Sequence, residues 1–201
     1  MIEIKALSVP VPQRRPLRGK GALTARAGLA LALFCAVATP RPLPAEEVDP
    51  WQPFRLLEGT WEAAIDGKLG TGKGIRRYDF ILEDLYFHAR HASVRMPQEK
   101  SPKGDYHREL SVYSFDRQRG TIVLRQFVVE GYVLRYTCAV EPRSFVCTSE
   151  SIESGPGQRA RLTIRLTDRY RFEEIFELAS PGGELEVFFT NTWVRLPDLA
   201  D

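Results

Sequence analysis

The side chains able to do chemistry are sparse in this sequence, and the three histidines are the first to consider. His88 and His91 stand three residues apart, and His107 follows in the next apolar run. On a β-strand, residues three apart point to opposite faces, so His88 and His91 cannot share one metal ion. His91 lies on the apolar face of its run, with Phe87 and Ala89. His91 is therefore a candidate for an inward, ligand-binding histidine, while a surface or hydrogen-bonded core histidine is the favoured interpretation, and no metal site is predicted.

Three charged residues stand on strand faces that are otherwise apolar. They are Arg125, Arg135 and Glu174, and Glu174 lies between Phe172 and Phe176 at a spacing of two. A buried charge must be paired with an opposite charge or with a ligand. We interpret these residues as polar anchors inside a pocket, where an arginine would receive a ligand carboxylate. An internal ion pair of arginine with glutamate, or an outward arginine, is the alternative.

The motifs of two common hydrolytic mechanisms are missing from the sequence. It contains no Gly-x-Ser-x-Gly, the tight turn that presents a nucleophilic serine. Glu173 and Glu174 are adjacent on an expected strand and point to opposite faces, so they cannot act as paired carboxylates. Binding is therefore favoured over catalysis.

Cys138 and Cys147 flank a short turn from Glu141 to Ser144. The hairpin register around this turn places the two cysteines directly opposite each other, close enough for a disulfide. Without a Cys-x-x-Cys spacing, a structural bridge is favoured over a redox-active pair. Two reduced, buried thiols remain the alternative.

Runs in which apolar and polar residues alternate with period two dominate the sequence from Trp51 onward, and they predict an all-β fold. Ten runs are expected to form strands: 60–66, 73–82, 85–94, 106–116, 121–130, 132–140, 145–151, 160–166, 170–178 and 184–195.

Short turns join most of these runs, which predicts hairpins between sequence neighbours. The longer links at 97–105 and 153–158 are too short for the helical crossovers of a parallel sheet. A meander of ten strands has two exposed edges unless it closes, so we expect a closed up-and-down antiparallel barrel. An immunoglobulin-like sandwich is the alternative.

The first 45 residues read as a signal peptide and spacer before a single domain at 46–201. Arginines precede an apolar run of about 12 residues from Ala27 to Ala38, too short for the roughly 20 that span a bilayer. Cleavage is expected after Ala38 or Ala45, with Arg14 and Arg15 leaving a twin-arginine route open. The protein is then periplasmic or extracellular, with no membrane span.

All of the excess basic charge belongs to this N-terminal segment. Residues 1–45 hold seven lysines and arginines and one glutamate, which leaves 21 basic and 25 acidic residues from Glu46 onward. The domain is therefore mildly acidic, and nucleic-acid binding is not expected.

The segment around Gly59 and Trp61 resembles the Gly-x-Trp opening of calycin-like barrels, in which the tryptophan plugs one end. From Trp51 to Pro197 the layout of ten strands is similar to nitrobindin-like barrels related to fatty-acid-binding proteins. Nitrobindins bind haem through a histidine on the final strand. Here residues 184–195 contain no histidine and Phe189 holds that place, so no cofactor is predicted and haem is kept as an alternative.

These observations together predict an exported barrel that binds a small hydrophobic or amphipathic molecule in its interior. A structural barrel with a filled interior, and an enzyme that uses Glu174, Arg125 and His91, are the alternatives. The candidate ligand-binding residues are Trp61, Tyr78, Phe80, His91, Arg125, Phe127, Phe172, Glu174 and Phe176.

Overall fold

The computed structural model describes residues 49–197. The expected signal peptide, its cleavage sites and the spacer up to Ala45 lie outside the described residues. Within 49–197, no helix is both long enough and apolar enough to span a bilayer.

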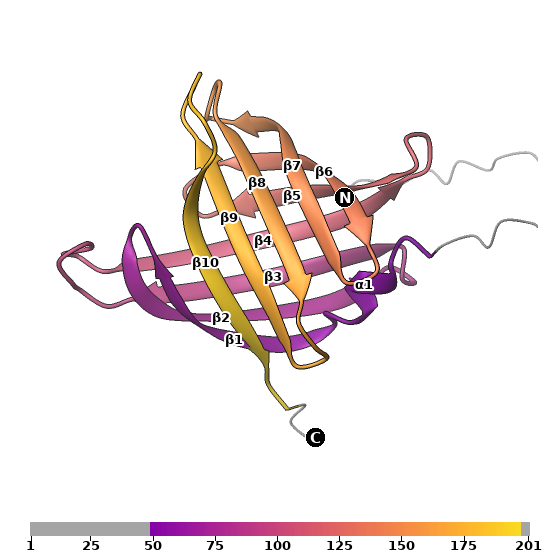
Figure 1. Cartoon of the computed structure of the whole chain (residues 1–201), viewed down its shortest axis with the longest axis horizontal. Coiled ribbons are helices and arrows are strands. Elements are labelled where there is room, and N and C mark those ends of the chain that lie inside the picture. The colour runs from indigo at the N-terminus through magenta and orange to yellow at the C-terminus, as the bar shows by residue number, and fades with distance from the viewer. Residues whose placement is uncertain (1–48, 198–201) are drawn as a thin grey trace, which may run out of the picture. The chain divides into compact units, whose positions relative to one another are not determined.

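Ten antiparallel strands close into one barrel, each paired with its neighbour in sequence, and the first strand also pairs with the last (Figure 1). The strands are β1 (Gly59–Gly67), β2 (Gly70–Ile81), β3 (Tyr86–Arg95), β4 (Asp105–Asp116), β5 (Thr121–Val128), β6 (Val133–Glu141), β7 (Ser144–Glu153), β8 (Arg159–Leu166), β9 (Arg171–Ala179) and β10 (Glu186–Arg195).

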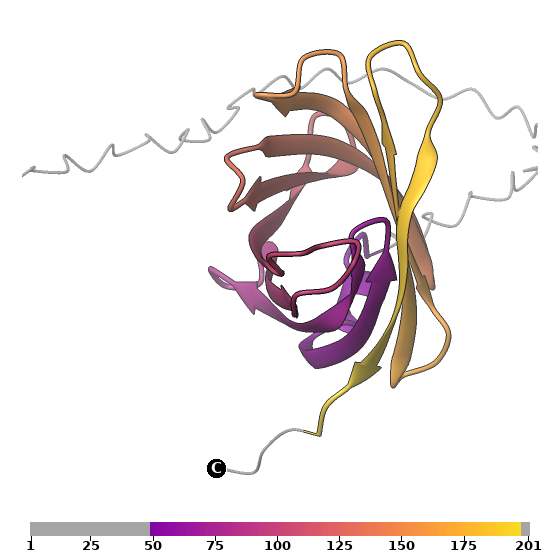
Figure 2. The ribbon, with the colours of Figure 1, turned by 90° about the vertical axis from the view of Figure 1, so that its left-hand side faces the viewer.

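Closure is visible in the pairing of β1, where Ala63 lies opposite Gly74 of β2 on one side and Trp193 of β10 on the other. The predicted all-β class and closed up-and-down barrel are therefore confirmed, and the sandwich alternative is wrong. Figure 2 looks toward the end of the barrel where the β1–β2 turn and the long β3–β4 loop lie.

An aromatic core fills the opposite end of the barrel, where the short helix α1 (Gln52–Arg55) lies. Phe54 of this helix stacks on Phe145 with 4.6 Å between ring centroids. The indole of Trp61 donates to the Leu57 carbonyl oxygen at 2.7 Å, and the Trp61 side chain is fully buried. Gly59 precedes it with φ of 118°, a conformation that favours glycine. We call this region the aromatic plug.

The predicted disulfide joins Cys138 and Cys147, which are direct partners in the β6–β7 register. Both cysteines point inward and are buried among the residues of the core. The bridge therefore links two neighbouring strands within the plug end of the barrel.

Apolar residues at every second position correctly predicted the inward faces of β1, β8 and β9. The same pattern predicted the wrong inward face for β5. Arg125 is exposed and donates to Ser114 Oγ at 3.1 Å, and Phe127 is 43% exposed. The expectation that they face inward is wrong because both parities of β5 carry apolar residues, and Leu124 and Gln126 are the inward ones. Arg135 also faces outward and pairs with Glu150 at 3.0 Å.

Candidate functional site

The open end of the barrel holds a pocket of about 340 Å³. Its wall is mostly apolar and comes from seven strands and the adjoining loops, with Ile65, Leu134, Leu162, Phe176, Leu178 and Phe189 among its residues. Its floor is polar and is formed by inward side chains of β3, β4, β5, β9 and β10: His91, His107, Glu109, Gln126, Glu174 and Asn191. The interior therefore changes from aromatic at the plug to charged beneath the pocket.

A buried ion pair forms the deepest part of this floor. Arg76 Nη1 lies 2.6 Å from Glu174 Oε1, and both side chains are almost completely buried. The other oxygen of Glu174 accepts from Trp193 Nε1 at 2.8 Å, and the Arg76 guanidinium lies over the Trp193 ring at 4.6 Å. Arg76 Nη1 also donates to the Tyr78 hydroxyl at 3.2 Å. The pair thus joins β2, β9 and β10 across the barrel.

Glu109 is the second carboxylate of the floor, and several strands contribute contacts to it. Arg76 Nη2 lies 3.4 Å from Glu109 Oε1, and Gln126 Nε2 donates to Glu109 Oε2 at 3.0 Å. The Tyr136 hydroxyl in turn donates to Gln126 Oε1 at 3.0 Å. These contacts fix the Glu109 carboxylate between Arg76 and the pocket.

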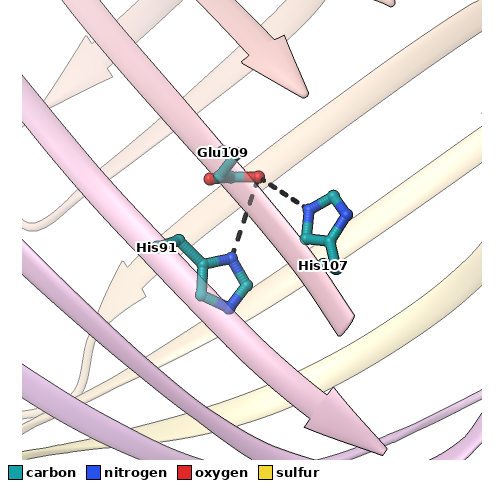
Figure 3. A group of neighbouring side chains, drawn as sticks. All are labelled: His91, His107 and Glu109. Carbon is teal, nitrogen blue, oxygen red and sulfur yellow. Dashed lines mark ion pairs between the residues drawn. The ribbon is translucent and has the colours of Figure 1, made fainter. Parts of the chain in front are cut away.

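Two imidazoles flank the same Glu109 oxygen (Figure 3). His91 Nδ1 lies 3.8 Å from Glu109 Oε2, and His107 Nε2 lies 3.6 Å from it. The β3–β4 register explains the arrangement, because His91 pairs directly with Glu109 while Ser93 pairs with His107. His107 Nδ1 makes a further contact of 2.8 Å with Glu130 at the pocket rim.

The two histidines carry opposite shifts in pKa. Burial and the neighbouring Arg76 guanidinium lower the pKa of His91. The pKa of His107 is raised to about 9, because hydrogen bonds with Glu109 and Glu130 outweigh the effect of burial. Burial alone would raise the pKa of Glu109, but the charges of Arg76 and protonated His107 hold it well below its usual value. At neutral pH, His91 is therefore neutral and His107 is cationic.

The protonation of His91 follows from its contact with Arg76. Arg76 Nη2 lies 3.2 Å from His91 Nδ1, and a guanidinium can only donate. His91 Nδ1 is thus an acceptor, and the ring proton of the neutral imidazole is on Nε2. His91 Nε2 is buried without a hydrogen-bond partner, as are Arg76 Nε, Arg95 Nε and Asn191 Oδ1. Such orphaned polar atoms are rare in folded proteins.

The candidate residues from the sequence divide into three groups. His91, Glu174 and Phe176 line the pocket. Trp61, Tyr78 and Phe172 are fully buried at the plug end, where Phe80 packs against them. Arg125 and Phe127 lie on the outer surface, so the catalytic set of Glu174, Arg125 and His91 does not converge.

Sequence reasoning missed five residues of the floor and its ion pair: Arg76, His107, Glu109, Gln126 and Asn191. Arg76 shares the parity of Tyr78 on β2, which was a sufficient signal for an inward side chain. His107 and Glu109 stand two apart and thus share a face, but only the β3–β4 register brings them to His91. The nine residues 96–104 between these strands leave that register undetermined by sequence.

Comparisons with known proteins give the fold and no family. No family model and no curated protein matches the sequence. Among solved structures, Rv2717c from M. tuberculosis is similar, with a TM-score of 0.56 and 14% identity over 74% of this chain and 98% of that chain.

Two further solved structures are a redesigned β-barrel and EF1p2_mFAP2b bound to DFHBI. Each has a TM-score of 0.32 and 15% identity, over 73% and 74% of this chain and 96% and 100% of theirs. The similarity to Rv2717c supports a ten-strand closed barrel, and nothing finer than the fold is transferred.

Proposed function

We propose that this protein is an exported carrier or sensor that binds one small amphipathic molecule in the open end of its barrel. The observation that carries the proposal is the two-part pocket, an apolar wall above a polar floor within about 340 Å³. Pockets of this size enclose one modest ligand and orient it with a few polar groups. The resemblance of the Gly59-x-Trp61 opening to calycin-like and nitrobindin-like barrels supports the same reading.

The charges of the floor restrict the polar end of that ligand. Among residues 49–197, both arginines that face the interior are already paired. Arg76 pairs with Glu174 and Glu109, and Arg95, which lines the pocket, pairs with Asp105 at 2.9 Å. Glu130 adds a third glutamate at the rim, against the cationic His107. An incoming carboxylate would find no unpaired guanidinium on the floor and would face these three glutamates. The ligand is therefore neutral or cationic at its polar end, unlike a fatty acid.

Two features support export of the mature domain. The N-terminal segment has the basic, apolar and small-residue order of a secretory signal. The disulfide between Cys138 and Cys147 is the type of bond that persists in oxidising compartments. We accordingly assign the protein to the periplasm or the extracellular space.

Titration with fluorescent amphiphiles tests the proposal. The probes are neutral 1-aminoanthracene and anionic anilinonaphthalene sulfonate, added to the purified full chain. Leu178→Trp places an indole into the pocket wall, while Val194→Trp adds the same group at a position that is 41% exposed on the outside. We expect the neutral probe to bind more tightly, and Leu178→Trp to weaken its binding at least tenfold with Val194→Trp unchanged.

Equal effects of the two tryptophan variants, or no probe binding at all, would contradict the proposal and favour a filled structural barrel. Native mass spectrometry of the protein purified from its oxidising compartment adds a direct readout. A molecule that is retained under mild conditions and lost on denaturation identifies the ligand class.

Haem is the other outcome that this spectrum would reveal, and the floor does not fit it in the nitrobindin manner. The last strand presents Phe189 and Asn191 to the pocket, and neither is a haem ligand. The two histidines of the floor come from β3 and β4 instead of the last strand. A haem mass would overturn this reading.

A further inference from the structure

The trio of His91, His107 and Glu109 forms a compact donor set at the bottom of the pocket (Figure 3). One potential ligand atom from each of the three residues lies within 4.8 Å of the other two. The three side chains come from neighbouring strands β3 and β4, and all of them line the pocket. The rigid pairing of these strands, rather than a loop, holds the donors in place.

The separations between donors suit a small metal ion. Two ligands of tetrahedral zinc, each about 2.0 to 2.1 Å from the ion, are about 3.3 Å apart. The Glu109 oxygen lies 3.6 Å from His107 Nε2 and 3.8 Å from His91 Nδ1. Side-chain adjustments of less than about 1 Å would therefore bring both nitrogens to coordination distance from one ion.

The surroundings of His107 match those of a metal-bound histidine. Such histidines usually donate their second ring N–H to a carboxylate, which fixes the tautomer and orients the ring. Glu130 Oε1 lies 2.8 Å from His107 Nδ1 and leaves Nε2 directed at Glu109. Gln126 similarly holds Glu109 by a hydrogen bond of 3.0 Å.

Arg76 is the group that an ion would have to displace in part. Its Nη2 lies 3.2 Å from His91 Nδ1, so this contact must lengthen before the nitrogen can bind a metal. Arg76 Nη1 stays anchored at 2.6 Å from Glu174, which allows the guanidinium to rotate without leaving its partner. Glu109, Glu130 and Glu174 together supply enough negative charge to accept a divalent cation beside Arg76.

We propose that His91 Nδ1, His107 Nε2 and a Glu109 oxygen bind one divalent transition metal of the zinc type, with a coordination position open toward the pocket. Binding releases the Nε2 proton of His107 to solvent, because a coordinating imidazole nitrogen must be unprotonated. Two imidazoles and one carboxylate suit such an ion better than Mg²⁺ or Ca²⁺, which prefer all-oxygen sites. The open position would take water or a donor atom of a pocket ligand. This site goes beyond the proposed carrier function and does not depend on it.

Competition with a chromogenic zinc indicator tests the site in the full chain after chelator treatment. We expect one Zn²⁺ per chain with submicromolar affinity, and Co²⁺ should give the intense visible absorption of a four-coordinate site. His107→Ala should weaken binding at least a hundredfold. Glu130→Gln removes only the supporting carboxylate and should weaken it 10- to 100-fold.

His88→Gln is the matched control. His88 lies on β3, as His91 does, but it points to the outer face and contacts the Asp79 carbonyl oxygen. This variant should bind Zn²⁺ as the parent does. The Glu130 side chain is 44% exposed, so Glu130→Gln should fold. This variant therefore still tests the site if His107→Ala fails to fold.

Binding weaker than about 100 μM, or an equal loss in His88→Gln and Glu130→Gln, would overturn the metal site. Probe binding in the chelator-treated protein is a separate readout. If that binding persists, the failure concerns the metal and leaves the carrier proposal intact.

Discussion

The two ends of the barrel interior use the same alternation of side chains for opposite purposes. At the plug, inward positions of β3 and β4 carry the aromatic rings of Phe87 and Tyr113, which pack against Phe54 of α1 and leave little room for a ligand. At the open end, inward positions of the same strands carry His91 and Glu109 beneath a pocket. The comparison indicates that one end stabilises the fold while the other is free to bind. Substitutions at the two ends should therefore separate stability from binding.

The largest effect is expected at the plug. Trp61→Ala removes a fully buried indole and its hydrogen bond to Leu57, and should lower the free energy of unfolding by about 4 kcal/mol. Chemical denaturation measures the change, with Ile75→Ala, at a position that is 49% exposed, as the control. A loss below about 1 kcal/mol would show that the plug does not dominate stability.

The ion pair at the boundary of the two ends should give the next largest effect. Arg76→Met leaves Glu174 buried without its cation and should cost about 3 kcal/mol. The double variant Arg76→Met with Glu174→Gln removes that charge and keeps an acceptor for the Trp193 N–H. Urea denaturation should show recovery of at least half of the loss. If the double variant is no more stable than Arg76→Met, the unpaired carboxylate is not the cause.

The smallest effect is expected from His107 at the open end. Its pKa is about 9 in the folded protein and about 6.5 when unfolded, so folding favours the protonated ring. This stabilisation is complete below pH 6.5 and is lost as the pH rises through 9. We expect a loss of about 1 kcal/mol, reduced by solvent screening of a ring that is partly exposed.

Denaturation of metal-free protein between pH 6.5 and pH 9.5 measures this loss, with His107→Gln as the reference. The other titrating groups are common to both proteins, so their difference isolates His107. An identical pH dependence would mean that Glu109 and Glu130 do not hold a proton on the ring.

The sequence predicted the structure correctly where a short turn set the register of two strands, and where only one face of a strand was apolar. The turn from Glu141 to Ser144 fixes one register, and the disulfide between Cys138 and Cys147 followed from it. In the strand from 160 to 166, apolar residues at every second position identify the inward face. These local patterns were enough to predict the closed barrel and its ten strands.

Prediction from the sequence failed where both faces of a strand were apolar, or where the ion-pair partner of a residue lay far away in the sequence. Both parities of β5 are apolar, so Arg125 was assigned to the wrong face. The partner of Glu174 is Arg76, 98 residues away, and the barrel closure that brings β9 near β2 has no local signal. The ion pair of Arg76 with Glu174 was therefore not predicted, because its two residues are brought together by strands that are distant in the sequence.

The pairing of β1 with β10 also fixes an order of events during folding. Hairpins from β1 to β9 can form as the chain is synthesised, but β1 must wait for Trp193 and its neighbours before it gains its second partner. Until then, the nascent sheet has two open edges that can pair with other chains. The time spent waiting for β10, more than the stability of the finished barrel, should decide how much of this protein aggregates during production.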